Sequence, residues 1–158
     1  TPPWFIEALI DQMKMDPNVG MATPVLRCDV QTVTDFITDR KAGRVGGTTA
    51  IFTDDFSALY FSKEVVPFTS ETYADDDPTP VYHHVGVYAY RAIALQDYLS
   101  WTEGPLERLE GLEQLRFLEN GHRIKCVKVQ ARGQQFWELN NPSDVVRLET
   151  ILRDSDMD

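Results

Sequence analysis

Residues 21–28 read MATPVLRC, a short apolar run that lies between two turn-forming segments. Such a run is typical of a buried β-strand. Before it, apolar residues recur at helical spacing over residues 5–13, and after it residues 30–40 can form a second helix with Asp29 as its N-cap. A helix, a buried strand and a helix in this order indicate an α/β protein.

The middle of the chain is rich in β-forming residues. Residues 48–53 and 58–62 predict a hairpin, and residues 81–90 alternate well enough to predict a third strand. We therefore expect residues 48–90 to form an inserted β-rich segment. Its acidic stretch, residues 69–79, holds too little apolar surface to pack by itself, and this predicts a surface loop.

Helical and strand patterns alternate again in the last third of the chain. The predicted elements are helices at 92–101 and 106–120, strands at 124–129 and 136–140, and a last helix that starts at Pro142. Gly121 is expected to end the second of these helices. The alternation predicts a single domain over residues 1–158, a layered α/β fold with a mostly parallel sheet and helices on both faces.

Composition and charge exclude several classes of protein. The net charge is -10 and the 15 basic residues are scattered, so we expect no nucleic-acid partner, although a few converging cations can still bind a small anion. No apolar run of about 18 residues exists, which excludes a membrane span. The two cysteines, Cys28 and Cys126, are far apart and form no metal-binding motif. A reducing cytoplasm is the expected location.

Four segments, taken together in order, resemble one enzyme family. They are ALYFSK at 58–63, HVGVYAYR at 84–91, PLE at 105–107 continuing to LEQLR at 112–116, and NPSD at 141–144. In this order and at this spacing they resemble the CMP-KDO synthetase family, the 3-deoxy-manno-octulosonate cytidylyltransferases. The resemblance spans essentially the whole chain.

The same resemblance implies what this chain lacks. Enzymes of the family begin with a strand and a Gly/Arg/Lys-rich loop that grips the CTP triphosphate, and a later Gly-Asp-Glu-Pro-like turn supplies a metal-binding aspartate. Neither motif occurs in these residues. We therefore expect this chain to be the C-terminal, sugar-binding portion, with the N-terminal nucleotide-binding part absent.

By resemblance, five residues line the pocket for the acidic sugar: Lys63, His84, Tyr88, Glu113 and Gln114. An eight-carbon sugar acid presents one carboxylate and many hydroxyl groups, so its pocket needs one cation and several hydrogen-bonding side chains. Lys63 stands where the family usually has Arg. The compact ammonium of Lys63 there replaces a planar guanidinium, which can bind a carboxylate through two N–H groups. No residue of this chain is assigned a catalytic role.

Two of these assignments have simpler alternatives. In a strand, His84 and Tyr88 share a face with Gly86 between them, which leaves room for a ligand, but His84 can also be a core histidine with satisfied hydrogen bonds. Glu113 can instead form a surface pair with Arg116 three residues later on the same helix. The residues themselves leave both alternatives open.

A magnesium ion is also implied by the resemblance. Asn140 stands where the family usually has an Asp that holds Mg²⁺ against the nucleotide phosphates, and an amide oxygen is a weaker ligand for a hard cation. If residues 136–140 are extended, Glu138 projects from the same face and its carboxylate can substitute. Asn140 or Asn141 can alternatively be the N-cap of the last helix.

The expected activity of the whole protein is transfer of CMP from CTP to an acidic sugar such as KDO, with release of pyrophosphate. This chain by itself is expected to be inactive. We also expect a homodimer to which residues 58–90 contribute. One alternative is a cytidylyltransferase for another acid, such as an amino-sugar acid or a phosphonate. The other is a non-catalytic binding domain that keeps the fold.

Overall fold

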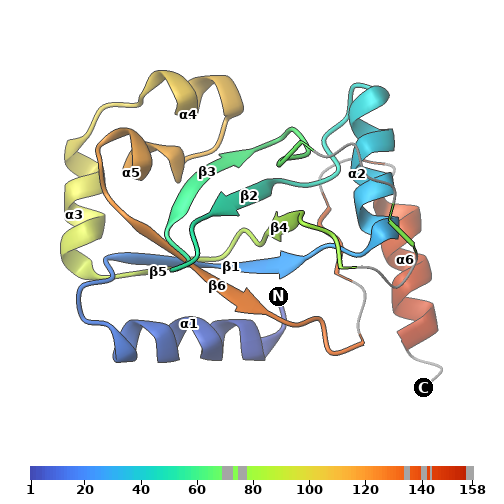
Figure 1. The fold of residues 1–158 in the computed structure, drawn as a ribbon, viewed down its shortest axis with the longest axis horizontal. Helices are drawn as coiled ribbons and strands as arrows, with labels where there is room; N and C mark the ends of the chain where they lie inside the picture. Colours follow the sequence, from blue (N-terminus) through green and yellow to red (C-terminus); the bar gives the residue numbers. More distant parts are fainter. Residues whose placement is uncertain (69–72, 75–77, 134–135, 140–141, 143, 156–158) are drawn as a thin grey trace.

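The structure is a computed structural model, and it describes residues 1–68, 73–74, 78–133, 136–139, 142 and 144–155 (Figure 1). At its centre lies one six-stranded sheet. The strands are β1 (Met21–Arg27), β2 (Thr49–Phe52), β3 (Ala58–Ser62), β4 (Tyr82–His84), β5 (Ala89–Tyr90) and β6 (Ile124–Val129). The helices are α1 (Pro3–Met15), α2 (Val30–Lys41), α3 (Ala92–Ser100), α4 (Pro105–Glu110), α5 (Leu115–Glu119) and α6 (Asp144–Ser155).

The first three predicted elements are confirmed as α1, β1 and α2. Phe5 and Leu9 on one side of α1 are buried, as the helical spacing of the apolar residues predicts. The carboxylate of Asp29 accepts the backbone N–H of Thr32 at 2.7 Å and caps α2.

The prediction of a mostly parallel sheet is wrong. β1 pairs with β4 and β5 along one edge, both antiparallel, and β2 pairs antiparallel with β3 and β4. Among the described strand pairs, only β1–β6 is parallel. The reason is connectivity, because β2 to β5 follow one another with no helix among the described residues between them, whereas parallel neighbours need a long crossover. The fold is therefore α/β with a mixed sheet.

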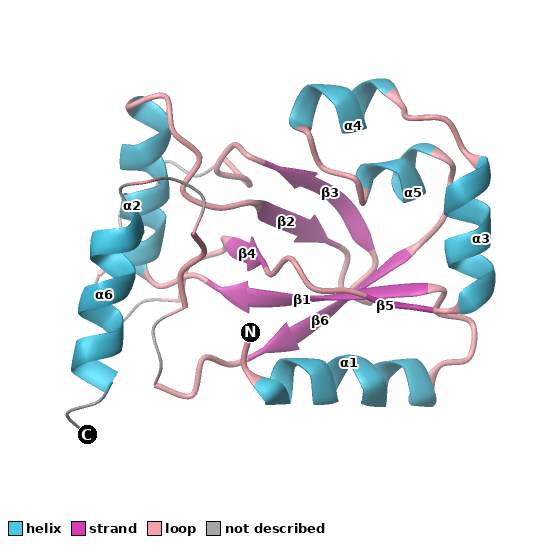
Figure 2. Cartoon of the chain, turned by 180° about the vertical axis from the view of Figure 1, so that it is seen from behind, coloured by secondary structure: helices cyan, strands magenta, loops and turns pink. Residues whose placement is uncertain are grey.

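Both faces of the sheet are covered. The first five residues of β1 are all buried, which requires packing on both sides of the strand. On one face, Leu115 and Phe117 of α5 join the main hydrophobic core. On the other, Phe36 of α2 packs edge-on against His83 at 5.2 Å. Figure 2 shows α2 and α6 at one end of the sheet and α3, α4 and α5 at the other.

The strand predicted over residues 81–90 is interrupted. Val25 pairs with His84 and Ala22 with Ala89, so residues 85–88 lie opposite only two residues of β1. We call residues 85–88 the bulge. The hydroxyl of Thr23 lies 3.2 Å from the carbonyl oxygen of Val85 and 3.0 Å from that of Val87, and thereby ties the bulge to β1.

The helix predicted over residues 106–120 is also interrupted. Gly111 adopts a left-handed conformation (φ 62°) and ends α4, and α5 begins only at Leu115. A left-handed residue cannot continue a right-handed helix, and glycine adopts this conformation without steric cost. Gly121 (φ 74°) follows α5, so its predicted role at the helix end is confirmed.

The strand predicted over residues 136–140 is not present in the described residues 136–139. The ring of Phe136 lies 5.4 Å from that of His83, and the ring of Trp137 lies 5.4 Å from that of Phe36, which itself packs on His83. Two consecutive side chains thus reach one cluster, whereas a strand would send them to opposite faces. Asn140 lies outside the described residues.

The predicted hairpin is confirmed as β2 and β3, and β2 joins it to the rest of the sheet by pairing with β4. Residues 48–90 therefore supply strands to the one central sheet. Most of the acidic stretch at 69–79 lies outside the described residues. Within the part of the chain that the structure describes, no helix has the length and apolar character needed to cross a membrane.

Candidate functional site

His84 is placed at the end of β4, where its side chain is 3% exposed. Its ring packs against those of Phe61 at 4.9 Å and Tyr88 at 5.6 Å. Burial, with a smaller contribution from neighbouring His83, lowers the pKa of His84 to about 3, so the imidazole is neutral at pH 7. Its Nε2 atom has no hydrogen-bond partner among the described residues.

Gln114 lies in the turn before α5 and is 1% exposed. The Tyr88 hydroxyl donates a hydrogen bond to its Oε1 atom at 3.2 Å. Burial raises the pKa of Tyr88, so this hydroxyl stays protonated at neutral pH. The Nε2 atom of Gln114, like that of His84, has no hydrogen-bond partner in the described part of the chain.

These contacts place His84, Tyr88 and Gln114 next to one another in a single chain of side chains. Leaving a buried polar atom without a partner costs about 1–3 kcal/mol, so native proteins rarely retain two such atoms in one place without a reason. A polar ligand that supplies the missing partners is one such reason. The alternative in which His84 is a core histidine with satisfied hydrogen bonds does not fit its unpartnered Nε2.

Lys63 follows β3 and is held by Glu110 of α4. The Glu110 carboxylate accepts the Lys63 backbone N–H at 3.0 Å and the Ser62 hydroxyl at 2.8 Å. The Lys63 side chain crosses to Gly111, where an added Cβ would lie 2.9 Å from its Nζ atom. The amine therefore lies against the turn that leads, three residues later, to Gln114.

Glu113 is exposed beside Gln114. The alternative in which it pairs with Arg116 is not observed, because Arg116 makes two 2.6 Å hydrogen bonds to the buried carboxylate of Glu107. The negative charge of Glu113 adds to the burial that raises the pKa of Tyr88. This charge therefore acts on the predicted pocket, and a binding role for Glu113 stays a prediction.

Glu138 faces the bulge and His83. Its Oε1 atom accepts the backbone N–H of Gly86 at 3.3 Å, and its Oε2 atom lies 3.6 Å from Nε2 of His83, which is longer than a hydrogen bond. Burial opposes ionisation of Glu138, but His83, the Gly86 N–H and His84 together outweigh it and lower its pKa.

The predicted magnesium site does not fit the residues around Glu138. A hard cation is bound by several oxygen ligands, whereas here the carboxylate faces an N–H group and an imidazole nitrogen. In the described part of the chain, no three His, Cys, Asp or Glu side chains are grouped so that they could hold a metal ion. The Glu138 assignment depended on an extended strand, and residues 136–139, the part of it that the structure describes, are not in a strand. A metal role for Asn140 stays a prediction.

Sequence patterns did not indicate several residues that support the site. Thr23 ties down the bulge, Phe61 packs against His84, and Glu110 holds Lys63. Their contacts join residues that are 62, 23 and 47 positions apart in the sequence, respectively, so no local pattern signals them. The one available signal was for Phe61, which lies two residues before Lys63 in the ALYFSK segment.

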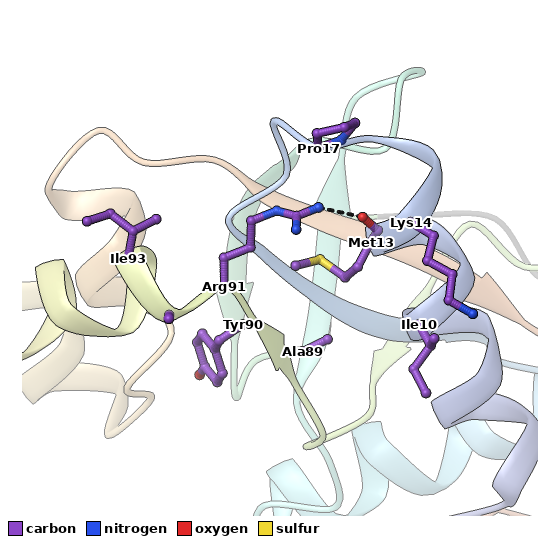
Figure 3. A pocket seen from close by; sticks show the side chains of 9 residues that line it. Ile10, Met13, Lys14, Pro17, Ala89, Tyr90, Arg91 and Ile93 are labelled. Carbon is purple, nitrogen blue, oxygen red and sulfur yellow. Dashed lines mark hydrogen bonds between the residues drawn. The ribbon is translucent and has the colours of Figure 1, made fainter.

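A separate groove of about 680 Å³ lies between α1 and the junction of β5 and α3 (Figure 3). It is lined mainly by apolar side chains, with Lys14 at its edge. The guanidinium of Arg91 donates to the carbonyl oxygens of Met13, Asp16 and Val19, so it serves the end of α1. None of the five predicted pocket residues lines this groove.

Comparisons with known proteins agree on one family. A family model described as cytidylyltransferase matches residues 4–124. The 3-deoxy-manno-octulosonate cytidylyltransferase of Maricaulis maris is 38% identical over 151 residues, which are 96% of this chain and 57% of that protein. The protein of the same name from Chlamydia pneumoniae is 34% identical over 148 residues, 93% of this chain and 52% of that protein. The chain thus spans about half the length of these relatives.

A solved structure has the same fold. It is described as CMP:2-keto-3-deoxy-manno-octonic acid synthetase complexed with CTP, and it matches with a TM-score of 0.73 and 24% sequence identity. The match covers 98% of this chain and 58% of that chain. At this level of identity the structural match bears on the fold only.

Proposed function

This chain belongs to the cytidylyltransferase family, and on that premise we propose that it forms the acidic-sugar-binding part of a 3-deoxy-manno-octulosonate cytidylyltransferase. The observation that carries the proposal is the pair of buried, unpartnered atoms, Nε2 of His84 and Nε2 of Gln114, on either side of Tyr88. A ligand rich in hydroxyl groups would supply partners to both.

The chemistry of an acidic sugar matches these groups. Gln114 Nε2 is a donor, Nε2 of neutral His84 can either donate or accept, and the Tyr88 hydroxyl, whose proton is donated to Gln114, can accept, which suits sugar hydroxyls. Lys63 supplies the cation for the sugar carboxylate. Because His84 and Tyr88 are both held neutral by burial, they bind without altering the charge of the ligand.

In the reaction of the whole protein, the anomeric hydroxyl of the sugar attacks the α-phosphorus of CTP. An oxygen–phosphorus bond forms, the bond from the α-phosphorus to the bridging oxygen breaks, pyrophosphate leaves, and the hydroxyl proton is released. Magnesium, when bound, neutralises charge on the phosphates. The residues of this chain hold the sugar so that its hydroxyl can reach the nucleotide.

The proposal includes a homodimer and a cytoplasmic location. Leu59 and Phe68, both within residues 58–90, are 58% and 91% exposed, which supports a contact of this segment with a second copy. Cys28 and Cys126 are free thiols, and two cysteines without a disulfide are typical of proteins from a reducing compartment.

The proposal is tested by Lys63→Ala in the full-length protein. Loss of the charge-assisted contact should weaken acceptor binding on the order of 10- to 100-fold and leave the KM for CTP unchanged. Lys14→Ala is the matched control, because Lys14 lines the apolar groove and should leave both values unchanged.

Unchanged acceptor binding in Lys63→Ala would contradict the proposal. The same assay, run with other sugar acids and with phosphonates, tests whether Lys63 in place of Arg selects a different acceptor.

A further inference from the structure

The conformation of the bulge, residues 85–88, sets the distance between the His84 and Tyr88 side chains. Because four residues lie opposite two of β1, the bulge cannot follow the regular ladder of the sheet. Its carbonyl groups at Val85 and Val87 face the Thr23 hydroxyl, and the N–H of Val85 donates to the carbonyl of Pro24 at 3.1 Å. These contacts hold the bulge from the side of β1.

The N–H of Gly86 is satisfied differently. It donates to Oε1 of Glu138 at 3.3 Å, a contact across 52 positions of sequence. The carboxylate lies directly against Gly86, since an added Cβ there would be in ordinary van der Waals contact with Oε1, at 3.7 Å. Glu138 is thus the group beyond the sheet that holds the tip of the bulge.

Glu138 is itself held by the core. The residues before it, Phe136 and Trp137, pack on His83 and Phe36, respectively. The indole N–H of Trp137 donates to the buried carboxylate of Asp144 at the start of α6, at 3.0 Å. The Glu138 carboxylate is therefore presented to Gly86 from an anchored segment.

We infer that Glu138 is a positioning residue of the predicted sugar pocket, and that it acts by holding the Gly86 N–H and hence the spacing of His84 and Tyr88. This inference rests on the proposed function for the identity of the ligand. It replaces the expectation that Glu138 is a metal ligand, because one oxygen of its carboxylate already accepts the Gly86 N–H and the other faces the His83 imidazole nitrogen at 3.6 Å.

Two variants of the full-length protein separate the two roles. Glu138→Ala removes the acceptor for the Gly86 N–H, so amide hydrogen exchange at Gly86 and the KM for the acceptor should both rise, by about tenfold for a lost bond to a charged group. Glu138→Gln keeps an oxygen that can accept this N–H, so both values should return close to those of the wild type. The KM for CTP and the Mg²⁺ requirement should not change in either variant.

Glu7→Gln, on the exposed side of α1, is the control for loss of one surface carboxylate. Unchanged Gly86 exchange in Glu138→Ala would overturn the inference, as would a raised Mg²⁺ requirement in Glu138→Gln. Lys63→Ala separates this inference from the proposed function. If Lys63→Ala leaves acceptor binding intact while Glu138→Ala accelerates Gly86 exchange, the function fails and the structural role of Glu138 stands.

Discussion

At the residue scale, burial sets the protonation of the groups around the predicted pocket. Burial lowers the pKa of His84 to about 3 and raises that of Tyr90 to about 12. Both shifts favour the uncharged form, as expected for groups removed from water. Period-2 spacing in a strand predicted that His84 and Tyr88 share a face, but their rings meet across the bulge and not along a regular strand. Their burial depends on Phe61 and Gln114, which come from other parts of the chain.

The low pKa of His84 makes stability depend on pH. The unfolded state binds a proton below pH 6.5, whereas the folded state does so only near pH 3, so stability is full above pH 6.5 and falls as the pH drops towards 3. At pH 5 the loss due to His84 is about 2 kcal/mol. His84→Phe should remove this part of the pH dependence.

The measurement is the free energy of unfolding in urea at pH 7.5 and pH 5. His122→Phe is the control, because His122 is exposed and its replacement should leave the wild-type difference between the two pH values. Equal losses in the wild type and in His84→Phe would refute this reading of His84.

Gly111 offers a second test at this scale. An alanine there must adopt φ 62°, which costs about 1–2 kcal/mol, and its Cβ would lie 2.9 Å from Nζ of Lys63. Gly121→Ala carries the same backbone cost (φ 74°) but its Cβ would meet nothing within 4 Å. Both variants should lose similar stability in thermal unfolding.

Acceptor affinity in the full-length protein should then distinguish the two glycine variants. Only Gly111→Ala displaces the Lys63 amine, so only that variant should bind the acceptor more weakly. Equal acceptor affinities in the two variants would show that the place of the amine beside Gly111 does not matter for binding.

At the scale of elements, predictions succeeded where the signal is local. The helical spacing in α1 and the Asp29 cap of α2 are readable within a few residues, and both are confirmed. The three misses are the bulge, the break at Gly111 and the irregular residues 136–139. The bulge and residues 136–139 depend on partners far along the chain, Thr23 and His83 respectively, whereas the break at Gly111 comes from the left-handed conformation of that residue itself.

The ion pair of Glu107 and Arg116 joins α4 to α5, the two short helices on either side of the turn that contains Gln114. Arg116 bonds the buried Glu107 carboxylate through two nitrogens and lies 4.3 Å from the centre of the Tyr98 ring. Glu107→Gln leaves the guanidinium without its charge partner, and we expect it to lower the free energy of unfolding by about 3 kcal/mol.

Glu103→Gln is the control for this prediction, because Glu103 is exposed and its replacement should change stability by less than about 0.5 kcal/mol. Urea unfolding of the two variants provides the comparison. A loss in Glu107→Gln no larger than that in Glu103→Gln would mean that the ion pair does not hold α4 to α5.

At the scale of the whole molecule, the alternation of helices and strands correctly predicted an α/β domain. It did not predict the direction of the strands. The described connections between β2 and β5 contain no helix, and antiparallel pairing follows. Family membership supports the proposal that the substrate is an acidic sugar. The homodimer and the metal site stay predictions.

The most direct test of the central claim follows the side-chain amide resonances of Gln114 by NMR while the full-length protein is titrated with the acidic sugar. Because Nε2 of Gln114 is buried and has no partner among the described residues, a bound sugar should shift its two protons in a saturable way. Lys63→Ala should move the titration to higher sugar concentration. Saturable sugar binding that leaves the Gln114 amide unchanged would contradict the account.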